Sequence, residues 1–235
     1  MEGLILTVAN PLNNPALELL ETSGVPYVLI YNQPCIKKHP TVTIDNVVAS
    51  CEVARALLGL GHEKLGMVSG IFAASDRASA RRDGFINAIV ASGRSCPMVL
   101  EVDFLTPNLD EILSPVYADR ATAPTALFCS NDLLAISVIG VLGRMGVDVP
   151  KDVSVIGFDG IAVGTHLHPT LATVIQPSRK MGQAATRQLL DRLAGKDCPD
   201  TEILLHTIRL GESAGPVAKS NPAINQKPKQ RRFSQ

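Results

Sequence analysis

The fold is decided by residues 124–159, PTALFCSNDLLAISVIGVLGRMGVDVPKDVSVIGFD. This segment predicts a strand, a polar turn, a long apolar helix ended by glycine, and a second strand that ends in an acid. Ser130, Asn131 and Asp132 follow the first strand, and Asp159 ends the second. In an open parallel sheet the carboxyl ends of the strands line the crevice where ligands bind. The segment therefore predicts a small-molecule site and supplies some of its polar contacts.

Strands and helices alternate along the rest of the chain, which predicts parallel sheets covered by helices on both faces. There are too many units for one compact sheet, and the pattern fits two similar sheets. The other strands are expected at 4–8, 27–31, 41–44, 65–69, 99–104 and 171–175, and a final extended stretch at 203–210. The other helices are expected at 15–22, 76–92, 107–118, 178–193 and between Asp45 and Gly59, where the buried stripe would be Val47, Cys51, Ala54 and Leu58.

The composition is that of a globular cytoplasmic protein. The 235 residues are 46% hydrophobic, enough for one large core or two smaller ones. No apolar run approaches the roughly 20 residues that a membrane span needs, so we expect no membrane partner. The amino terminus lacks the features of a signal peptide. Five scattered cysteines without a CxxC spacing predict reduced thiols, with neither a disulfide framework nor a zinc site.

The formal charge of zero is unevenly distributed. Five bases follow the last acid, Glu212, so residues 1–218 hold 17 bases against 22 acids, a net charge of −5. An acidic body argues against a nucleic-acid surface on the body itself. Residues 215–235 are polar, basic and without periodicity, and are predicted to be a disordered tail.

The motifs of enzymes are missing from the sequence. It contains no GxGxxG, P-loop, GxSxG or HExxH motif, so we expect no enzyme activity and no cofactor. His166 and His168 lie in a predicted loop without an evident third ligand, so no metal site is expected. No Ser–His–Asp set can be argued from the spacing.

The candidate binding residues each have an alternative structural role. Asp159 is either an acceptor for ligand hydroxyls or a cap for the next loop, and its strand-end position favours the ligand. Asn131 has donors and acceptors that suit sugar hydroxyls or base edges, whereas Asp132 is equally well explained as a helix cap. Arg81 either lies on a solvated helix face or pairs with ligand groups through its planar fork. Phe104 either stacks on a sugar or base or fills the core.

The predicted helix 132–145 is apolar almost all round, with Leu133, Ile136 and Ile139 among its residues. Such a helix is either interior on every side, or packed against the sheet on one face and against a second subunit on the other.

A set of stretches in a fixed order resembles the effector-binding domain of the lactose/galactose repressor family of bacterial transcriptional regulators. The resemblance covers residues 3–213. The stretches are GLIL at 3–6, GVPYVLI at 24–30, ARALLGLGHEKLGMVSG at 54–70, Arg81 with GF at 84–85, PTALFCSNDLLA at 124–135, VDVPKDVSVIGFD at 147–159 and PTLATVIQP at 169–177.

This resemblance implies a periplasmic-binding-protein-like type I α/β fold. Two Rossmann-like parallel-sheet subdomains would be joined by three crossings, with the effector in the cleft between them. The amino-terminal subdomain would comprise 1–60 and 175–206, and the carboxyl-terminal one 61–174 and 207–214. Members of the family begin with a helix-turn-helix headpiece, a hinge and two βα units before the GLIL strand. We therefore expect a chain truncated at its amino terminus, with an incomplete first subdomain.

The resemblance also implies a function and a set of effector contacts. The expected function is ligand sensing and dimerisation in a transcriptional regulator, with a sugar or nucleoside-like effector. A homodimer is expected, and operator DNA is a partner only if a headpiece exists upstream. The alternatives are a sugar-binding transport receptor of the same fold, a non-sensing dimerisation fragment, and an enzyme on a doubly wound sheet. The implied effector-binding residues are Arg81, Phe104, Asn131, Asp159 and Gln176.

Overall fold

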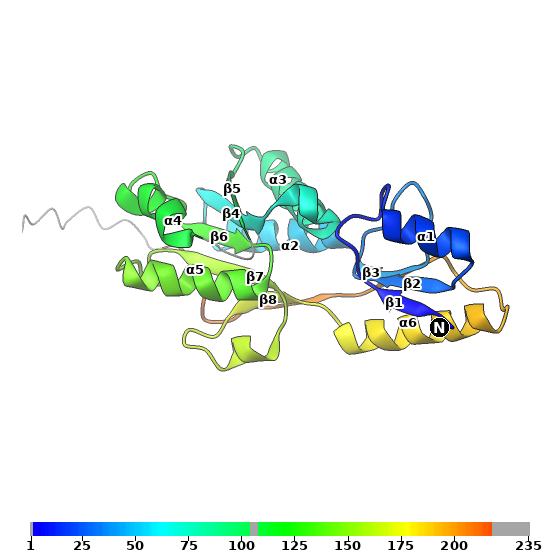
Figure 1. Cartoon of the computed structure of the whole chain (residues 1–235). Helices are drawn as coiled ribbons and strands as arrows, with labels where there is room; N and C mark the ends of the chain where they lie inside the picture. Colours follow the sequence, from blue (N-terminus) through cyan, green and yellow to red (C-terminus); the bar gives the residue numbers. More distant parts are fainter. Residues whose placement is uncertain (1, 104–107, 218–235) are drawn as a thin grey trace, which may run out of the picture.

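A computed structural model describes residues 2–103 and 108–217 and places two sheets side by side (Figure 1). The first sheet has four parallel strands in the order β1-β2-β3-β9. The bounds of its strands are β1 Leu4–Leu6, β2 Tyr27–Ile30, β3 Thr41–Ile44 and β9 Thr201–Leu204.

The second sheet has six strands in the order β10-β8-β7-β6-β4-β5. Five of them are parallel, and β10 pairs antiparallel with β8. The bounds are β4 Leu65–Gly70, β5 Met98–Val102, β6 Ala126–Cys129, β7 Ser154–Asp159, β8 Ala172–Ile175 and β10 Thr207–Arg209.

Helices cover both faces of each sheet, as the alternation of elements predicts (Figure 1). The first sheet lies between α1 (Pro15–Ser23) and α6 (Ser178–Leu193). For the second sheet, α2 (Asn46–Gly59) and α3 (Asp76–Ala91) pack on one face, and α4 (Leu109–Ala118) and α5 (Asp132–Arg144) on the other. Short 3-10 helices lie at Phe72–Ala74 and Ala162–Thr165. Among the described residues, no helix is both long and apolar enough to cross a membrane.

Three crossings join the two sheets, so the predicted fold class is confirmed. The chain crosses between β3 and β4, between β8 and β9, and between β9 and β10. The extended stretch expected at 203–210 contains the end of β9, which pairs with β3, and all of β10, which pairs with β8 in the other sheet. The break falls at Leu205 and His206, where the ring of His206 lies 3.0 Å from the carboxylate of Glu52.

Helices α2 and α3 approach each other very closely. A Cβ atom on Gly84 would overlap the carbonyl oxygen of Val47, so only glycine fits at this crossing.

The division of the chain into subdomains at residues 60, 174 and 206 stays a prediction. Although α2 precedes residue 60, its packing associates it with the second sheet.

Of the buried stripe predicted for α2, Ala54 is confirmed, whereas Val47 is 38% exposed and Cys51 and Leu58 are only half-buried. The buried residues of the helix are Asn46, Ala49, Ser50, Val53, Ala54 and Leu57. Apolar residues surround this helix on most sides, so periodicity alone could not select the buried face. Contact with α3 and the second sheet selects it instead.

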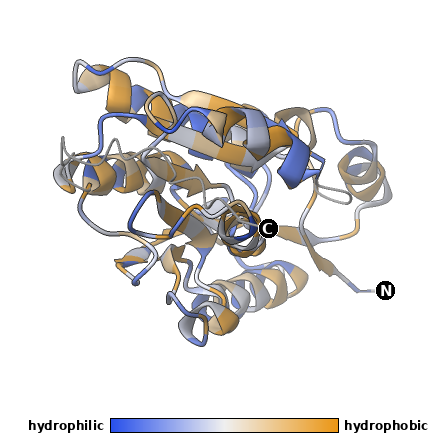
Figure 2. Cartoon of the chain, turned by 90° about the vertical axis from the view of Figure 1, so that its left-hand side faces the viewer, coloured by the Kyte–Doolittle hydropathy of each residue, from blue (hydrophilic) through white to orange (hydrophobic). Residues whose placement is uncertain are grey.

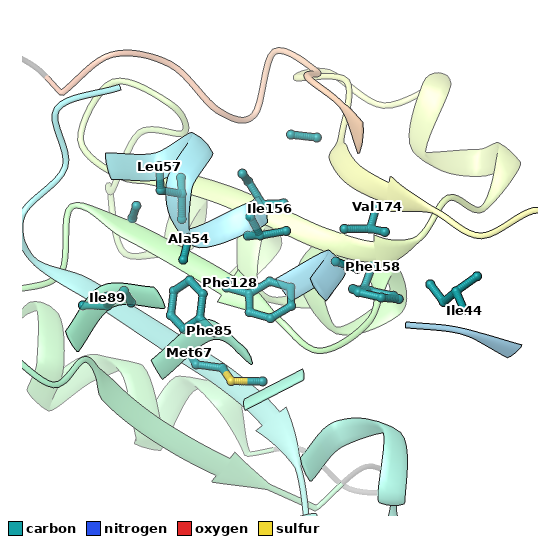
Figure 3. Packing of buried hydrophobic residues seen from close by; sticks show 14 of the residues in the cluster. Ile44, Ala54, Leu57, Met67, Phe85, Ile89, Phe128, Ile156, Phe158 and Val174 are labelled. Atoms are coloured by element: carbon teal, nitrogen blue, oxygen red, sulfur yellow. The ribbon is translucent and has the colours of Figure 1, made fainter. Parts of the chain in front are cut away.

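The core of the second sheet depends on alternation along its strands. In β6, Phe128 faces the side of α2 and α3, whereas Leu127 and Cys129 face α4 and α5. The rings of Phe85, Phe128 and Phe158 form a buried row, with centroid separations of 5.1 and 6.3 Å (Figure 3). Figure 2 colours the backbone by residue hydropathy, and hydrophobic and hydrophilic segments alternate along the helices.

We predict that Gly84→Ala destabilises the protein by about 1–3 kcal/mol, because the added methyl group forces α2 and α3 apart. Urea denaturation measures the change. The matched control is Gly143→Ala in α5, where a Cβ meets nothing within 4 Å and higher helix propensity should raise stability by roughly 0.5–1 kcal/mol. Equal effects of the two substitutions would contradict the close approach.

Candidate functional site

A cavity of about 970 Å³ lies between the two sheets, at the carboxyl ends of their strands. It is within the size range of small-molecule sites. Strand ends and the residues that follow them contribute Thr7 after β1, Tyr31 after β2, Gly70 in β4, Ser130 and Asn131 after β6, Asp159 and Gly160 at β7, and Gln176 after β8.

The structure brings four of the five predicted effector-binding residues to this cavity. Arg81, Asn131, Asp159 and Gln176 all line it. Phe104 falls outside the described residues. Effector contact by each of these residues stays a prediction.

Arg81 is held inside the protein, so a solvated helix face is excluded for it. The residue is 5% exposed. Its Nε donates to Asn46 Oδ1 at 2.7 Å, and one terminal nitrogen donates to the Ser130 carbonyl at 2.5 Å. The guanidinium carbon lies 3.6 Å from the centre of the Phe158 ring, a cation–π contact. Burial lowers the pKa of Arg81 to about 10, so the group is still charged at neutral pH.

Asp159, the last residue of β7, is the acidic partner of Arg81. Its Oδ1 lies 3.6 Å from Arg81 and accepts a hydrogen bond of 2.7 Å from Gln176 Nε2. Burial raises the pKa of this carboxyl, and the charge of Arg81 partly offsets the rise. Its φ of 116° is rare for a residue with a side chain. Oδ2 has no hydrogen bond within the described part of the chain, so it is available to a ligand hydroxyl.

Gln176 has an acceptor without a partner. The residue is 8% exposed, and its Oε1 is buried without a hydrogen bond to any described residue. A buried acceptor left unpaired costs free energy, and the hydroxyl of a ligand would satisfy it.

The helix cap of α5 is Asn131 and not Asp132, which differs from the expectation for these two residues. Asn131 is the amino-terminal cap of α5, because its Oδ1 accepts from Leu134 N at 2.9 Å. The interpretation of Asp132 as the helix cap is therefore wrong. It is fully buried and accepts from Thr173 Oγ1 at 2.6 Å and from Ile161 N at 2.8 Å. Asp132 thus holds the loop after β7 against β8, while the Nδ2 of Asn131 has no hydrogen bond to any described residue.

A set of contacts between the two sheets, beside the cavity, was missed from the sequence. Asp76 Oδ2 accepts from Asn32 Nδ2 at 3.0 Å and from Gln33 N at 2.7 Å, which ties the start of α3 to the end of β2. Arg77 lines the cavity and donates to the Val8 carbonyl at 3.1 Å. A helix start such as SDR usually indicates a local cap, so the sequence holds no signal for these distant partners.

Comparison with known proteins identifies the domain type. The model of the periplasmic binding protein-like domain matches residues 54–214. The HTH-type transcriptional repressor PurR of Aliivibrio fischeri (strain MJ11) is 30% identical over 206 residues, 84% of this chain and 59% of that protein. Catabolite control protein A of Priestia megaterium is 29% identical over 217 residues, 91% of this chain and 64% of that protein. The chain thus spans less than two thirds of the length of these relatives.

Solved structures have the same architecture. A putative transcriptional regulator LacI from Bacillus cereus subsp. cytotoxis NVH 391-98 superimposes with a TM-score of 0.84 at 25% identity, over 92% of this chain and 77% of that one. A complex of the transcriptional regulator CelR with cellobiose gives a TM-score of 0.79 at 27% identity, over 91% and 66% of the two chains.

We predict that Asp159→Asn gains stability relative to the wild type as the pH rises above 3.8, the ordinary pKa of an aspartate. With a raised pKa, the folded wild type binds more protons at this carboxyl than the unfolded chain does. Its stability contribution therefore falls as pH rises from 3.8 through the raised pKa, and the asparagine has no such loss. Urea denaturation between pH 4 and about 7 measures the difference.

The control is Asp110→Asn on α4, an exposed carboxylate that lies 3.0 Å from Arg144. This variant makes the same chemical change away from the cavity and shows what the substitution alone does to the measurement. A constant difference between wild type and Asp159→Asn across the window would show that the Asp159 carboxyl is as easily ionised as an exposed one.

Proposed function

Because the chain belongs to the periplasmic binding protein-like family of lactose/galactose repressor-type transcriptional regulators, we propose that it senses a small molecule in the cavity between its sheets. The effector would be a sugar or a nucleoside-like compound. The bound cellobiose of the CelR structure supports the sugar class, since that protein is 27% identical.

One observation carries the proposal: complementary polar groups converge on a single cavity from distant parts of the chain. Arg81 supplies a fixed cation, and Asn131 supplies an amide donor. Asp159 and Gln176 each supply an oxygen that has no partner among the described residues. A polyhydroxylated ligand offers both donors and acceptors, so it can satisfy all four groups at once.

Binding of the effector would change the relative position of the two sheets, and this change would be the signal. The cavity is lined from both sides, so an effector that contacts both is bound more tightly when the sheets are close. The hydrogen bonds of Asp76 to Asn32 and Gln33 join the sheets at the rim of the cavity. We propose that they favour the closed arrangement, and that the amino-terminal and carboxyl-terminal subdomains divided at 60, 174 and 206 are the moving bodies. We also propose that Phe104 stacks on the sugar or base of the effector.

We further propose that the chain forms a homodimer through the outer face of α5. The inner face of this helix packs on the second sheet through Leu134, Val138 and Val141. The helix is therefore not interior on every side. On its outer face Leu133, Ser137 and Gly140 are exposed, and Ile136 and Ile139, half-buried against the core, lie beside them; this mostly apolar surface suits a partner helix.

Membership of this family also bears on enzyme activity, cellular location and DNA binding. The matched proteins named above are transcriptional regulators, and we propose that this chain is likewise no enzyme and acts in the cytoplasm without a cofactor. Operator DNA would be contacted only by a headpiece upstream of these residues. A transport receptor of the same fold and a fragment that dimerises without sensing are the competing functions.

We predict that a screen of sugars, sugar phosphates and nucleosides finds a compound that raises the melting temperature of the wild type. At 100 times its Kd, a ligand contributes about 2.7 kcal/mol, or roughly 5–10 °C for a chain of this size. Asp159→Ala should lose most of this ligand-induced shift, whereas Asp110→Ala should keep it, because Asp110 does not line the cavity. No shift with any compound, together with clean dimerisation, would favour the non-sensing fragment.

We predict that Ile136→Arg converts the dimer into a monomer, because a charged side chain on the outer face of α5 cannot be desolvated at an apolar contact. Size-exclusion chromatography with light scattering should show one 25.0 kDa chain in place of two. Val90→Arg, on an exposed position of α3, serves as the control and should stay dimeric. A dimer that survives Ile136→Arg would place the interface elsewhere.

A further inference from the structure

The charges that line the cavity do not balance. It is lined by four cationic side chains, Arg77, Arg81, Arg179 and Lys180, against one carboxylate, Asp159. Arg81 pairs with Asp159, and Arg77 lies 3.2 Å from the carboxylate of Asp76.

The two uncompensated cations lie together. Arg179 and Lys180 have no ion pair with any residue in 2–103 or 108–217, and both are exposed on the cavity wall. The excess of positive charge is therefore concentrated in one turn of the chain, at the start of α6.

The same turn also lacks the groups that normally stabilise a helix start. α6 has 16 residues, no side-chain hydrogen bond from its cap residue Pro177, and no acid in its first turn. The first amides of a helix carry partial positive charge, so adding two cations beside them is unfavourable unless an anion is bound there. Free backbone N–H groups and two flexible cations together form a binding place for an anionic group.

A second, independent observation beside this turn points to a ligand. Gln176, two residues before α6, is buried and presents an acceptor, Oε1, without a partner among the described residues. That atom requires a hydroxyl or N–H donor, which an inorganic anion does not supply. A ligand that satisfies both Gln176 and the start of α6 must carry a hydroxyl group and a negative charge within one turn of the chain.

On the premise of the proposed function, we infer that the effector is an anionic polyhydroxylated compound, whose phosphate or carboxylate binds the amino terminus of α6 beside Arg179 and Lys180. Two uncompensated positive charges match a phosphate monoester, which carries about −1.5 to −2 at neutral pH, better than a carboxylate. Neutral sugars would leave both cations and the helix amides without a partner.

The test compares matched probes by isothermal titration and thermal shift: glucose, gluconate and glucose 6-phosphate, and ribose with ribose 5-phosphate. We expect a phosphorylated or acidic member to bind the wild type at least about tenfold more tightly than its neutral counterpart, with affinity that falls as salt is raised. The double variant Arg179→Gln/Lys180→Gln should lose that preference. Both positions are exposed, so the variant should fold, and its melting temperature without probe checks this.

The matched control is Lys38→Gln/Arg55→Gln, which removes two exposed cations that do not line the cavity and have no ion pair with a described residue. It should bind the anionic probes like the wild type. Loss of affinity in both double variants would indicate only a long-range charge effect and overturn the site. Equal or tighter binding of the neutral sugars would overturn this inference and leave the proposed sensing function standing. Absence of binding by every probe would count against both.

Discussion

The site depends on the burial of one guanidinium group. Arg81 lies in the protein interior, and a buried charge is tolerated only where it is paired and its donors are satisfied. Its partners come from three other elements: Asn46 from α2, the Ser130 carbonyl after β6, and the Phe158 ring with Asp159 from β7. The arginine therefore sets the relative positions of α2, α3 and two strand ends, and the cavity takes its shape from them.

The hydrophobic core supports this arrangement directly. The row of Phe85, Phe128 and Phe158 ends against the guanidinium of Arg81, so packing in the second sheet and orientation of the polar site are coupled. At the same point the backbone of Asp159 has a φ of 116°, and Gly160 follows with a φ of 75°. A Cβ at Gly160 would lie 2.8 Å from Ile175 Cα, so a close approach to β8 requires glycine there. The strained turn aims Asp159 at Gln176 and the cavity.

The two walls of the cavity differ in whether their charged side chains have partners within the protein. Fixed pairs hold the side near the second sheet, where Arg81 and Asp132 have their partners within the protein. The start of α6 holds Arg179 and Lys180, exposed and without ion pairs among the described residues. A rigid polar wall facing a charged, uncompensated one suits a ligand that is oriented by hydrogen bonds and attracted by charge. It also makes the closure of the sheets dependent on what occupies the space between them.

The sequence by itself determined the alternation of strands and helices, the two-sheet architecture and the strand ends where polar groups gather, because these follow from local periodicity and turn residues. Arg81, Asn131 and Asp159 could be singled out as candidates from the sequence itself, Gln176 was implied only by the family resemblance, and all four line the cavity. Only the tertiary structure decided that Arg81 is buried, since its side-chain partners lie 35 and 49 residues away. It also decided that Asn131 rather than Asp132 caps α5, which face of α2 is buried, and where the chain crosses between β9 and β10. Each of these choices depends on packing and pairing with residues distant in sequence, for which local pattern holds no information.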